Sequence, residues 1–220
     1  YPLRRQRQMC IRDRDMGERQ TLLKSITEDI YSGSLIKSPK LSIFEIEYSG
    51  LINEVERVYS ALGGTSEQIP INYGPWDISL KDFCIELDEE RHFNRYRLET
   101  LASSIYNDFP FFSVSNYKTY CLTKEEQCLR AASWGNNWKT NSSDKNFVIS
   151  GDYGDLSENG SSRWRQRAFY DFIKDLNSVI RKVPILRISI YDTYNGNTVN
   201  EMLIKKDVRN LRAFLKDLKI

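Results

Sequence analysis

Residues 76 to 92 restrict the possible folds more than any other part of this chain. Apolar Phe83, Ile85 and Leu87 alternate with Cys84, Glu86 and Asp88, and a period of two residues is typical of a β-strand with one apolar face. A run of β-type residues begins at Asp77, and residues 80 to 82 between the two runs are typical of a turn. The segment therefore predicts two neighbouring strands, near residues 76 to 79 and 83 to 88.

Three carboxylates could converge on this pair of strands. Glu86 and Asp88 are two residues apart and point to the same face, and Asp77 lies on the preceding strand. Carboxylates that lie within a few Å of one another raise one another's pKa, so a cation is needed to hold them together. Mg²⁺ and Mn²⁺ prefer oxygen ligands. The pattern predicts a site for Mg²⁺ or Mn²⁺ whose ligands are Asp77, Glu86 and Asp88.

The same residues resemble the core of the PD-(D/E)XK nuclease superfamily, in which an Asp begins one strand of a hairpin and a Glu-x-Lys motif lies on the next. The match is similar to the branch around the very-short-patch-repair endonucleases, which has Glu-x-Asp, a short turn and a His. In this chain the corresponding residues are Asp77, Glu86-Leu87-Asp88 and His92. The resemblance implies an α/β fold with a restriction endonuclease-like core, a central mixed β-sheet flanked by helices.

The resemblance also implies a metal-dependent endonuclease that hydrolyses phosphodiester bonds, with DNA as substrate, in restriction, repair or phage defence. Asp88 stands where the superfamily usually has Lys, which leaves open what activates the attacking water. His92 is the single histidine of the chain, and it could take a proton from that water or give one to the leaving group. The expected catalytic residues are Asp77, Glu86, Asp88 and His92.

A fourth metal ligand could come from the helix expected over residues 51 to 62, whose apolar stripe ends at Gly63-Gly64. In the superfamily a first helix often contributes a Glu to the metal site, and here Glu54 or Glu56 could be that residue. The alternative is that this glutamate simply lies on the solvent-exposed face of the helix, opposite the apolar stripe, and has no role in metal binding.

Two further helices are expected to supply arginines for phosphate binding. Arg95 and Arg97 lie in a helix expected from residue 94 to 106, although nearby glutamates could pair with them instead. Arg163, Arg167 and Lys174 share one face of a segment that starts at Arg163 and is expected to be helical near residues 164 to 180, and a strand is expected at 185 to 191. This order is similar to the closing half of the restriction endonuclease-like fold, where a basic helix lies over the site.

The segment from residue 107 to 162 loses hydrophobic periodicity, so we expect a loop-rich insertion. Its Trp134 and Trp138 could stack on bases or form a local aromatic core. Cys121 and Cys128 lack the spacing of a zinc site, and we expect two half-buried thiols.

Residues 9 to 14, Met-Cys-Ile-Arg-Asp-Arg, match the translation of a transposon-end sequencing adapter. We therefore expect residues 1–15 to be a non-native extension that packs against nothing, and residues 16–220 to form a single domain. A genuine basic N-terminal arm is the alternative.

Composition narrows the class of protein without naming a partner. The 32 basic and 30 acidic residues nearly cancel, so any surface that binds nucleic acid has to be local. We find neither an apolar run of membrane-spanning length nor a secretory signal, so we expect a cytoplasmic protein with no membrane partner. A homodimer could supply two sites for cutting two strands.

Two other classes of protein fit the same residues. One is a catalytically inactive nuclease-like module that binds nucleic acid or a protein partner. The other is a different metal-dependent enzyme, such as a phosphatase, although the chain lacks the paired Asp and His motifs expected there.

Overall fold

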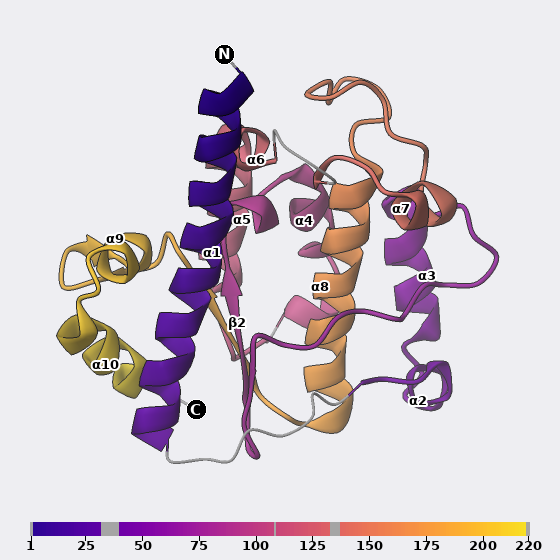
Figure 1. Cartoon of the computed structure of the whole chain (residues 1–220). Coiled ribbons are helices and arrows are strands. Elements are labelled where there is room, and N and C mark those ends of the chain that lie inside the picture. Colours follow the sequence, from indigo (N-terminus) through magenta and orange to yellow (C-terminus); the bar gives the residue numbers. More distant parts are fainter. Residues whose placement is uncertain (1, 32–39, 108, 133–136, 219–220) are drawn as a thin grey trace.

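The computed structural model describes residues 2–31, 40–107, 109–132 and 137–218, with side chains described from residue 17 onward. These parts of the chain form a mixed α/β fold (Figure 1). The α-helices are α1 (Pro2–Tyr31), α2 (Ile43–Tyr48), α3 (Ile52–Ala61), α4 (Arg95–Thr100), α5 (Val114–Thr123), α6 (Glu125–Ala131), α7 (Asn141–Asn146), α8 (Ser162–Arg181), α9 (Val199–Ile204) and α10 (Val208–Asp217). Short 3₁₀ helices among the described residues include η1 (Glu90–His92) and η2 (Ser104–Tyr106).

A small mixed sheet lies at the centre of the molecule. Its strands β1 (Ile78–Ser79), β2 (Cys84–Asp88) and β3 (Ile185–Ser189) are hydrogen-bonded in the order β1-β2-β3. The pair β1 and β2 is antiparallel, with Ile78 opposite Ile85, whereas β2 and β3 are parallel, with Glu86 opposite Arg187. A separate hairpin joins β4 (Thr193–Tyr194) to β5 (Asn197–Thr198).

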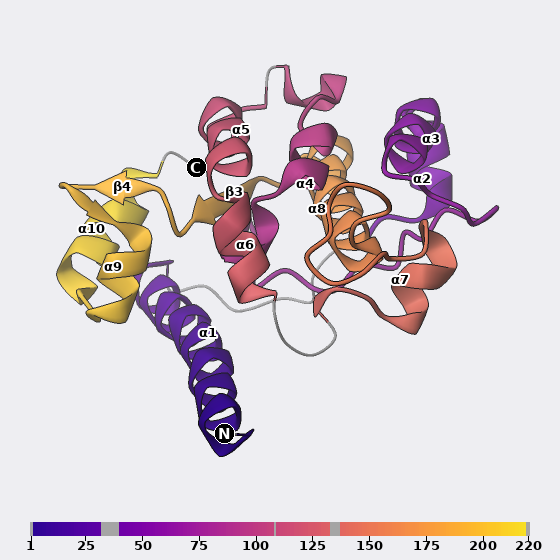
Figure 2. The ribbon, with the colours of Figure 1, turned by 90° about the horizontal axis from the view of Figure 1, so that it is seen from above.

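Helices cover both faces of the sheet, so both faces of β2 are buried. One apolar cluster contains Ile85 and Leu87 of β2 together with residues of α1, α9 and α10. The larger cluster lies on the opposite face and contains Cys84 of β2 and much of α8. Viewed from above, the yellow helices α9 and α10 and the indigo α1 lie on one side of β3, and α8 and α3 lie on the other (Figure 2). Glu86 and Asp88 therefore point into the interior and not toward bulk water.

The long helix α8 is well defined at both ends. The Ser161 hydroxyl accepts a hydrogen bond from the Trp164 backbone amide at 3.1 Å, which caps the N-terminus. Lys182 adopts a left-handed conformation with φ of 58°, and Pro184 follows before β3 begins. The helices expected near 51 to 62 and 164 to 180 and the strands expected near 83 to 88 and 185 to 191 are thus confirmed.

The prediction of a loop-rich insertion at residues 107 to 162 is wrong for much of that segment. It contains α5, α6 and α7, and it supplies Tyr117, Cys128, Trp138 and Phe147 to the larger apolar cluster. These helices are 6 to 10 residues long, too short to give a clear periodic pattern. The helix expected over 94 to 106 is also shorter than predicted, because α4 ends at Thr100 and η2 follows.

The aromatic and sulfur-containing side chains of this segment have structural contacts. Trp138 is 5% exposed, and its ring packs edge-on against Trp164 with centroids 5.3 Å apart, as expected for a local aromatic core and not for base stacking. Trp134 lies outside the described residues. Cys121 and Cys128 are free thiols, and both are fully buried instead of half-buried.

The expectation that residues 1–15 pack against nothing concerns side chains outside the described part of the chain. From residue 17 onward α1 is an integral part of the fold, because Leu23 and Ile26 are buried against α10 and the sheet. Within the described ranges, no helix combines the length and the apolar character needed to cross a membrane.

Candidate functional site

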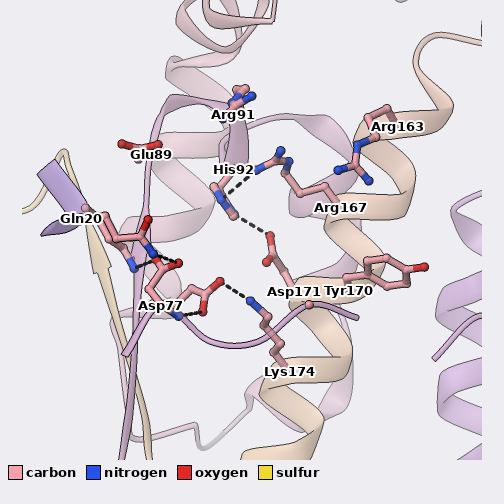
Figure 3. Close-up of a pocket in the computed structure, with 13 residues that line it drawn as sticks. Gln20, Asp77, Glu89, Arg91, His92, Arg163, Arg167, Tyr170, Asp171 and Lys174 are labelled. Atoms are coloured by element: carbon pink, nitrogen blue, oxygen red, sulfur yellow. Dashed lines mark hydrogen bonds and ion pairs between the residues drawn. The ribbon is translucent and has the colours of Figure 1, made fainter. Parts of the chain in front are cut away.

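A pocket of about 300 Å³ opens over the sheet between α1 and α8. Figure 3 shows Gln20 of α1 on one side and a row of side chains from α8 on the other. The lining residues are mostly charged or polar: Gln20, Gly74, Asp77, Glu86, Leu87, Glu89, Arg91, His92, Arg163, Arg167, Tyr170, Asp171 and Lys174. Three of the four expected catalytic residues, Asp77, Glu86 and His92, are therefore brought to one pocket.

Asp77 and Glu86 lie next to each other at the start of the hairpin. The Asp77 backbone amide donates to Glu86 Oε2 at 3.4 Å, and Asp77 Oδ2 accepts from the Leu87 amide at 2.9 Å. On the other side, Gln20 Nε2 donates to Asp77 Oδ1 at 2.6 Å. Burial raises the pKa of Asp77 to about 6 and that of Glu86 to about 7.

Lys174 of α8 lies against Glu86. Its ammonium forms an ion pair with Glu86 Oε1 and donates to the Pro75 carbonyl oxygen at 3.1 Å. Lys174 is 7% exposed and Glu86 4% exposed, so the pair is almost fully desolvated. The attraction of the ammonium lowers the pKa of Glu86, but burial outweighs it.

His92 is held in one tautomer by its neighbours. Its Nδ1 lies 2.8 Å from Asp171 Oδ2 and 3.2 Å from Asp88 Oδ1. Since carboxylates only accept and arginine only donates, Nδ1 carries the proton, and Nε2 accepts from Arg167 Nη1 at 3.2 Å. Burial would raise the pKa of Asp171, but His92 and Arg187 outweigh it and hold that pKa well below its usual range.

Asp88 does not join the pocket, contrary to the sequence prediction. Arg187 Nη1 donates to both of its carboxylate oxygens, at 2.8 and 2.9 Å, and the Tyr117 hydroxyl donates at 3.0 Å. Asp88, His92 and Asp171 place ligand atoms within 4.8 Å of one another, the spacing of a metal site. The arginine already neutralises Asp88, so this group is better explained as part of a buried ion-pair network.

The four arginines expected to bind nucleic acid divide into two pairs. Arg163 and Arg167 line the pocket from α8. Arg97 is 1% exposed and pairs with Asp175 at 2.7 Å, so it is a core residue and cannot reach a ligand. Arg95 is exposed, but it pairs with Glu125 at 2.8 Å and lies outside the pocket lining. For Arg95 and Arg97 the alternative of pairing with carboxylates holds, although the partners are not the nearby glutamates.

Glu54 does not lie in the pocket either. It accepts from Arg57 Nε at 2.8 Å on the same helix and from the Ser103 hydroxyl. The first contact lies within α3 and the second joins α3 to the segment after α4, so the geometry gives Glu54 a structural role and not that of a metal ligand. Arg57 and the Ser103 hydroxyl lower the pKa of this carboxyl to about 2 against a smaller effect of burial.

Sequence reasoning missed two pocket residues with a clear chemical role, Gln20 and Asp171, and it placed Lys174 on the face of Arg163 and Arg167 without assigning it to the site. The spacing of Arg163, Arg167, Asp171 and Lys174 at intervals of three and four residues was a usable signal, because such residues share a helix face. No local pattern could have revealed Gln20, since it reaches Asp77 across 57 positions of sequence.

Fold and site together define a mixed α/β protein with a pocket that holds carboxylates at one end and arginines at the other. The chain belongs to a family of unknown function, DUF7255, whose model matches residues 57–205. The matched region includes all the pocket residues except Gln20. No curated protein and no solved structure matches the chain significantly.

Proposed function

We propose that this protein is a nuclease that uses Mg²⁺ or Mn²⁺ to hydrolyse phosphodiester bonds in DNA. The observation that carries the proposal is the meeting of Asp77, Glu86 and Lys174 in one pocket. These are the three residue types of the PD-(D/E)XK motif. Lys174 comes from α8 and not from the strand position held by Asp88, and it supplies the positive charge that the linear motif lacks.

The order of elements supports the same proposal. Asp77 immediately precedes β1, Glu86 lies on the antiparallel partner β2, and α8 passes over the site before β3 joins parallel to β2. A hairpin that carries the acidic residues, followed by a basic helix and a further strand, is the order expected of a restriction endonuclease-like core.

Asp77 and Glu86 suit a divalent cation. Both offer oxygen ligands, and burial raises both pKa values, so a bound cation would stabilise their ionised forms. When bound, Mg²⁺ or Mn²⁺ would neutralise developing charge on the phosphoryl group and lower the pKa of an attacking water. Gln20 and Lys174 lie beside these carboxylates and would hold them in position.

The remaining pocket residues have roles that follow from their geometry. His92 Nε2 carries a lone pair, since Nδ1 donates its proton toward Asp171, and it can accept a proton from the attacking water. Arg167, which now donates to Nε2, would turn to the substrate phosphate. Asp171 keeps the imidazole in the required tautomer.

Cleavage of DNA by the purified protein in Mg²⁺ tests this proposal. We expect Glu86→Gln and Lys174→Gln each to reduce the cleavage rate by about 100-fold or more, the scale on which positioned catalytic groups act. Glu56→Gln changes an exposed glutamate on α3 and should leave the rate unchanged. Calorimetric titration with Mn²⁺ should show weaker binding in Asp77→Asn and Glu86→Gln.

Two results would count against the nuclease. Equal cleavage by wild type and Glu86→Gln would indicate a contaminating enzyme. DNA binding without cleavage in any divalent cation would instead support the non-catalytic module.

A further inference from the structure

The groups expected to react are recessed in the pocket: Asp77 and His92 are half-buried, and Glu86 lies deepest, beside the positioning residue Asp171. Glu86 is 4% exposed, and Asp171 is 3% exposed. The volume of about 300 Å³ is at the lower end of the range for small-ligand sites. A rigid duplex is too wide to bring its backbone to groups at this depth.

The walls of the pocket are fixed elements of the fold. On one side, Gln20 bonds to Asp77 and the neighbouring Arg19 pairs with Glu89 and Glu90 at 3.3 and 3.2 Å. On the other side, α8 packs in the larger apolar cluster. Admitting a duplex would require α1 to leave its apolar contacts, whereas a single strand can enter between the two helices.

The arginine end of the pocket is suited to an anion. Arg163 and Arg167 lie one helical turn apart, and neither forms an ion pair within the described part of the chain. Arg163 bonds to Gln166 Oε1 and Arg167 bonds to His92 Nε2, both neutral partners. Two half-buried guanidinium groups without a carboxylate repel each other, and a bound phosphate would relieve that repulsion.

The arginine end is separated from the carboxylate end along α8. Arg167 and Lys174 are seven residues apart, which corresponds to about 10 Å along the helix axis at about 1.5 Å per residue. That distance spans about three nucleotides of a stacked strand at about 3.4 Å each. A phosphate bound by the arginines therefore lies about three nucleotides along the strand from the phosphate beside Glu86, and the substrate contains more than one phosphate.

From the depth of the recessed groups, the fixed walls and the spacing of the charges, we infer that the pocket admits one strand of a polynucleotide and excludes the intact duplex. Asp77 and Glu86 lie at the phosphate to be cleaved, and Arg163 and Arg167 bind a phosphate further along the same strand. This inference rests on the proposed function, whose substrate class it specifies. A strand within a duplex would first have to unpair, at a cost of a few kcal/mol.

Binding measured without divalent cations tests the inference separately from catalysis. The probes are a short labelled single-stranded DNA oligonucleotide, RNA of the same sequence, and the blunt DNA duplex, each titrated in EDTA by fluorescence anisotropy. We expect at least one of the single strands to bind about tenfold or more tightly than the duplex. Equal or tighter binding of the duplex would overturn the inference.

Variants of the arginines test the phosphate contacts. Arg163→Gln with Arg167→Gln should weaken single-strand binding and reduce the magnitude of the salt dependence, d log K/d log[salt], by about 0.7, as expected for the loss of one bound phosphate on a single strand. Arg209→Gln with Arg212→Gln on α10 removes the same charge outside the pocket and should change this slope far less. Arg163→Lys with Arg167→Lys keeps both charges and should retain most of the slope, which separates phosphate binding from a loss of fold. Equal effects of the two glutamine pairs would overturn the assignment of the arginines.

Cleavage assays on the same oligonucleotides separate the two proposals. Absence of cleavage together with a single-strand preference in EDTA would contradict the nuclease and support the inference about the pocket. Mg²⁺-dependent cleavage together with equal binding of duplex and single strand would support the nuclease and contradict the inference about the pocket.

Discussion

At the scale of single residues, the buried charges of this protein fall into two groups. Asp88 and Asp175 each accept hydrogen bonds from Arg187, and the carboxylate of Asp175 also accepts from Arg97 and Tyr106. Asp77 and Glu86 have fewer positive partners, and burial raises the pKa of both. A carboxylate whose charge is poorly compensated by the fold is a better candidate for binding a cation or a substrate than one already matched by arginine.

Asp192 provides a test of buried charge away from the pocket. Its carboxylate accepts from the Ser189 amide at 2.9 Å and from the Tyr120 hydroxyl at 3.2 Å, and burial raises its pKa from 3.8 to about 6. A raised pKa means that the folded state holds the proton more tightly than the unfolded state. The contribution of Asp192 to stability therefore falls as the pH rises from about 4 to about 6, and it stays low above that.

We expect Asp192→Asn to remove the loss of stability that ionisation of Asp192 causes at higher pH, because asparagine is neutral and can still accept a hydrogen bond from the Ser189 amide. The quantity to compare is the free energy of unfolding of the variant minus that of wild type. This difference should be larger at about pH 8 than at about pH 4, by on the order of 1 to 2 kcal/mol after allowance for partial exposure. Urea denaturation at both pH values measures the difference. The same relative stability at both pH values would show that the charge of Asp192 is not destabilising.

At the scale of elements, α8 has two roles on two of its surfaces. Asp175 and Asp171 turn toward β3, where both contact Arg187, and Asp175 also binds Arg97 of α4. Arg163, Arg167 and Lys174 turn toward the pocket. The buried ion pairs therefore fix the orientation of the helix, and that orientation places the basic side chains over the hairpin.

Asp175→Asn tests whether this network positions α8. The change leaves Arg97 and Arg187 without one charged partner in a fully buried site, and we expect it to lower the free energy of unfolding by about 3 to 5 kcal/mol. Glu125→Gln is the matched control, because its partner Arg95 is 47% exposed, and an exposed pair contributes no more than about 1 kcal/mol. Denaturant unfolding of both variants should therefore give clearly different midpoints, and similar midpoints would contradict the structural role of the network.

At the scale of the whole molecule, the sheet is shared between two apolar clusters. The cluster with α1, α9 and α10 covers one face, and the cluster with α8 covers the other. Because β2 and β3 contribute side chains to both clusters, loss of one cluster exposes a face of the strands that support the other. We therefore expect the molecule to unfold in one cooperative transition.

Leu23→Ala tests the contribution of α1 to this unit. Leu23 is fully buried, and the truncation should destabilise the protein by about 2 to 5 kcal/mol with a single transition retained. Leu122→Ala removes the same atoms from a leucine that is 70% exposed, and it should change stability by less than about 0.5 kcal/mol. Thermal unfolding followed by circular dichroism would show a second, separate transition if α1 and its neighbours formed an independent unit.

The sequence by itself determined the elements whose pattern is local. Alternation over residues 83 to 88 determined β2, and the helical spacing of apolar residues determined α3 and α8. It also placed Asp77, Glu86 and His92 in one short segment, close enough along the chain for the hairpin to bring them together. These features depend on neighbouring residues, so periodicity and turn residues report them.

The tertiary structure alone decided which charged residues are functional candidates and which support the fold. Asp88 and Glu86 share one face of one strand, yet Arg187 from β3 neutralises the first and the pocket contains the second. Lys174 reaches Glu86 across 88 positions of sequence, and Arg97 is removed from the surface by Asp175. Each outcome depends on which distant side chain packs against a given charge. A buried charge without a partner costs a large amount of free energy, so the partner decides the role of the residue. Because that partner is distant along the chain, it leaves no local pattern in the sequence.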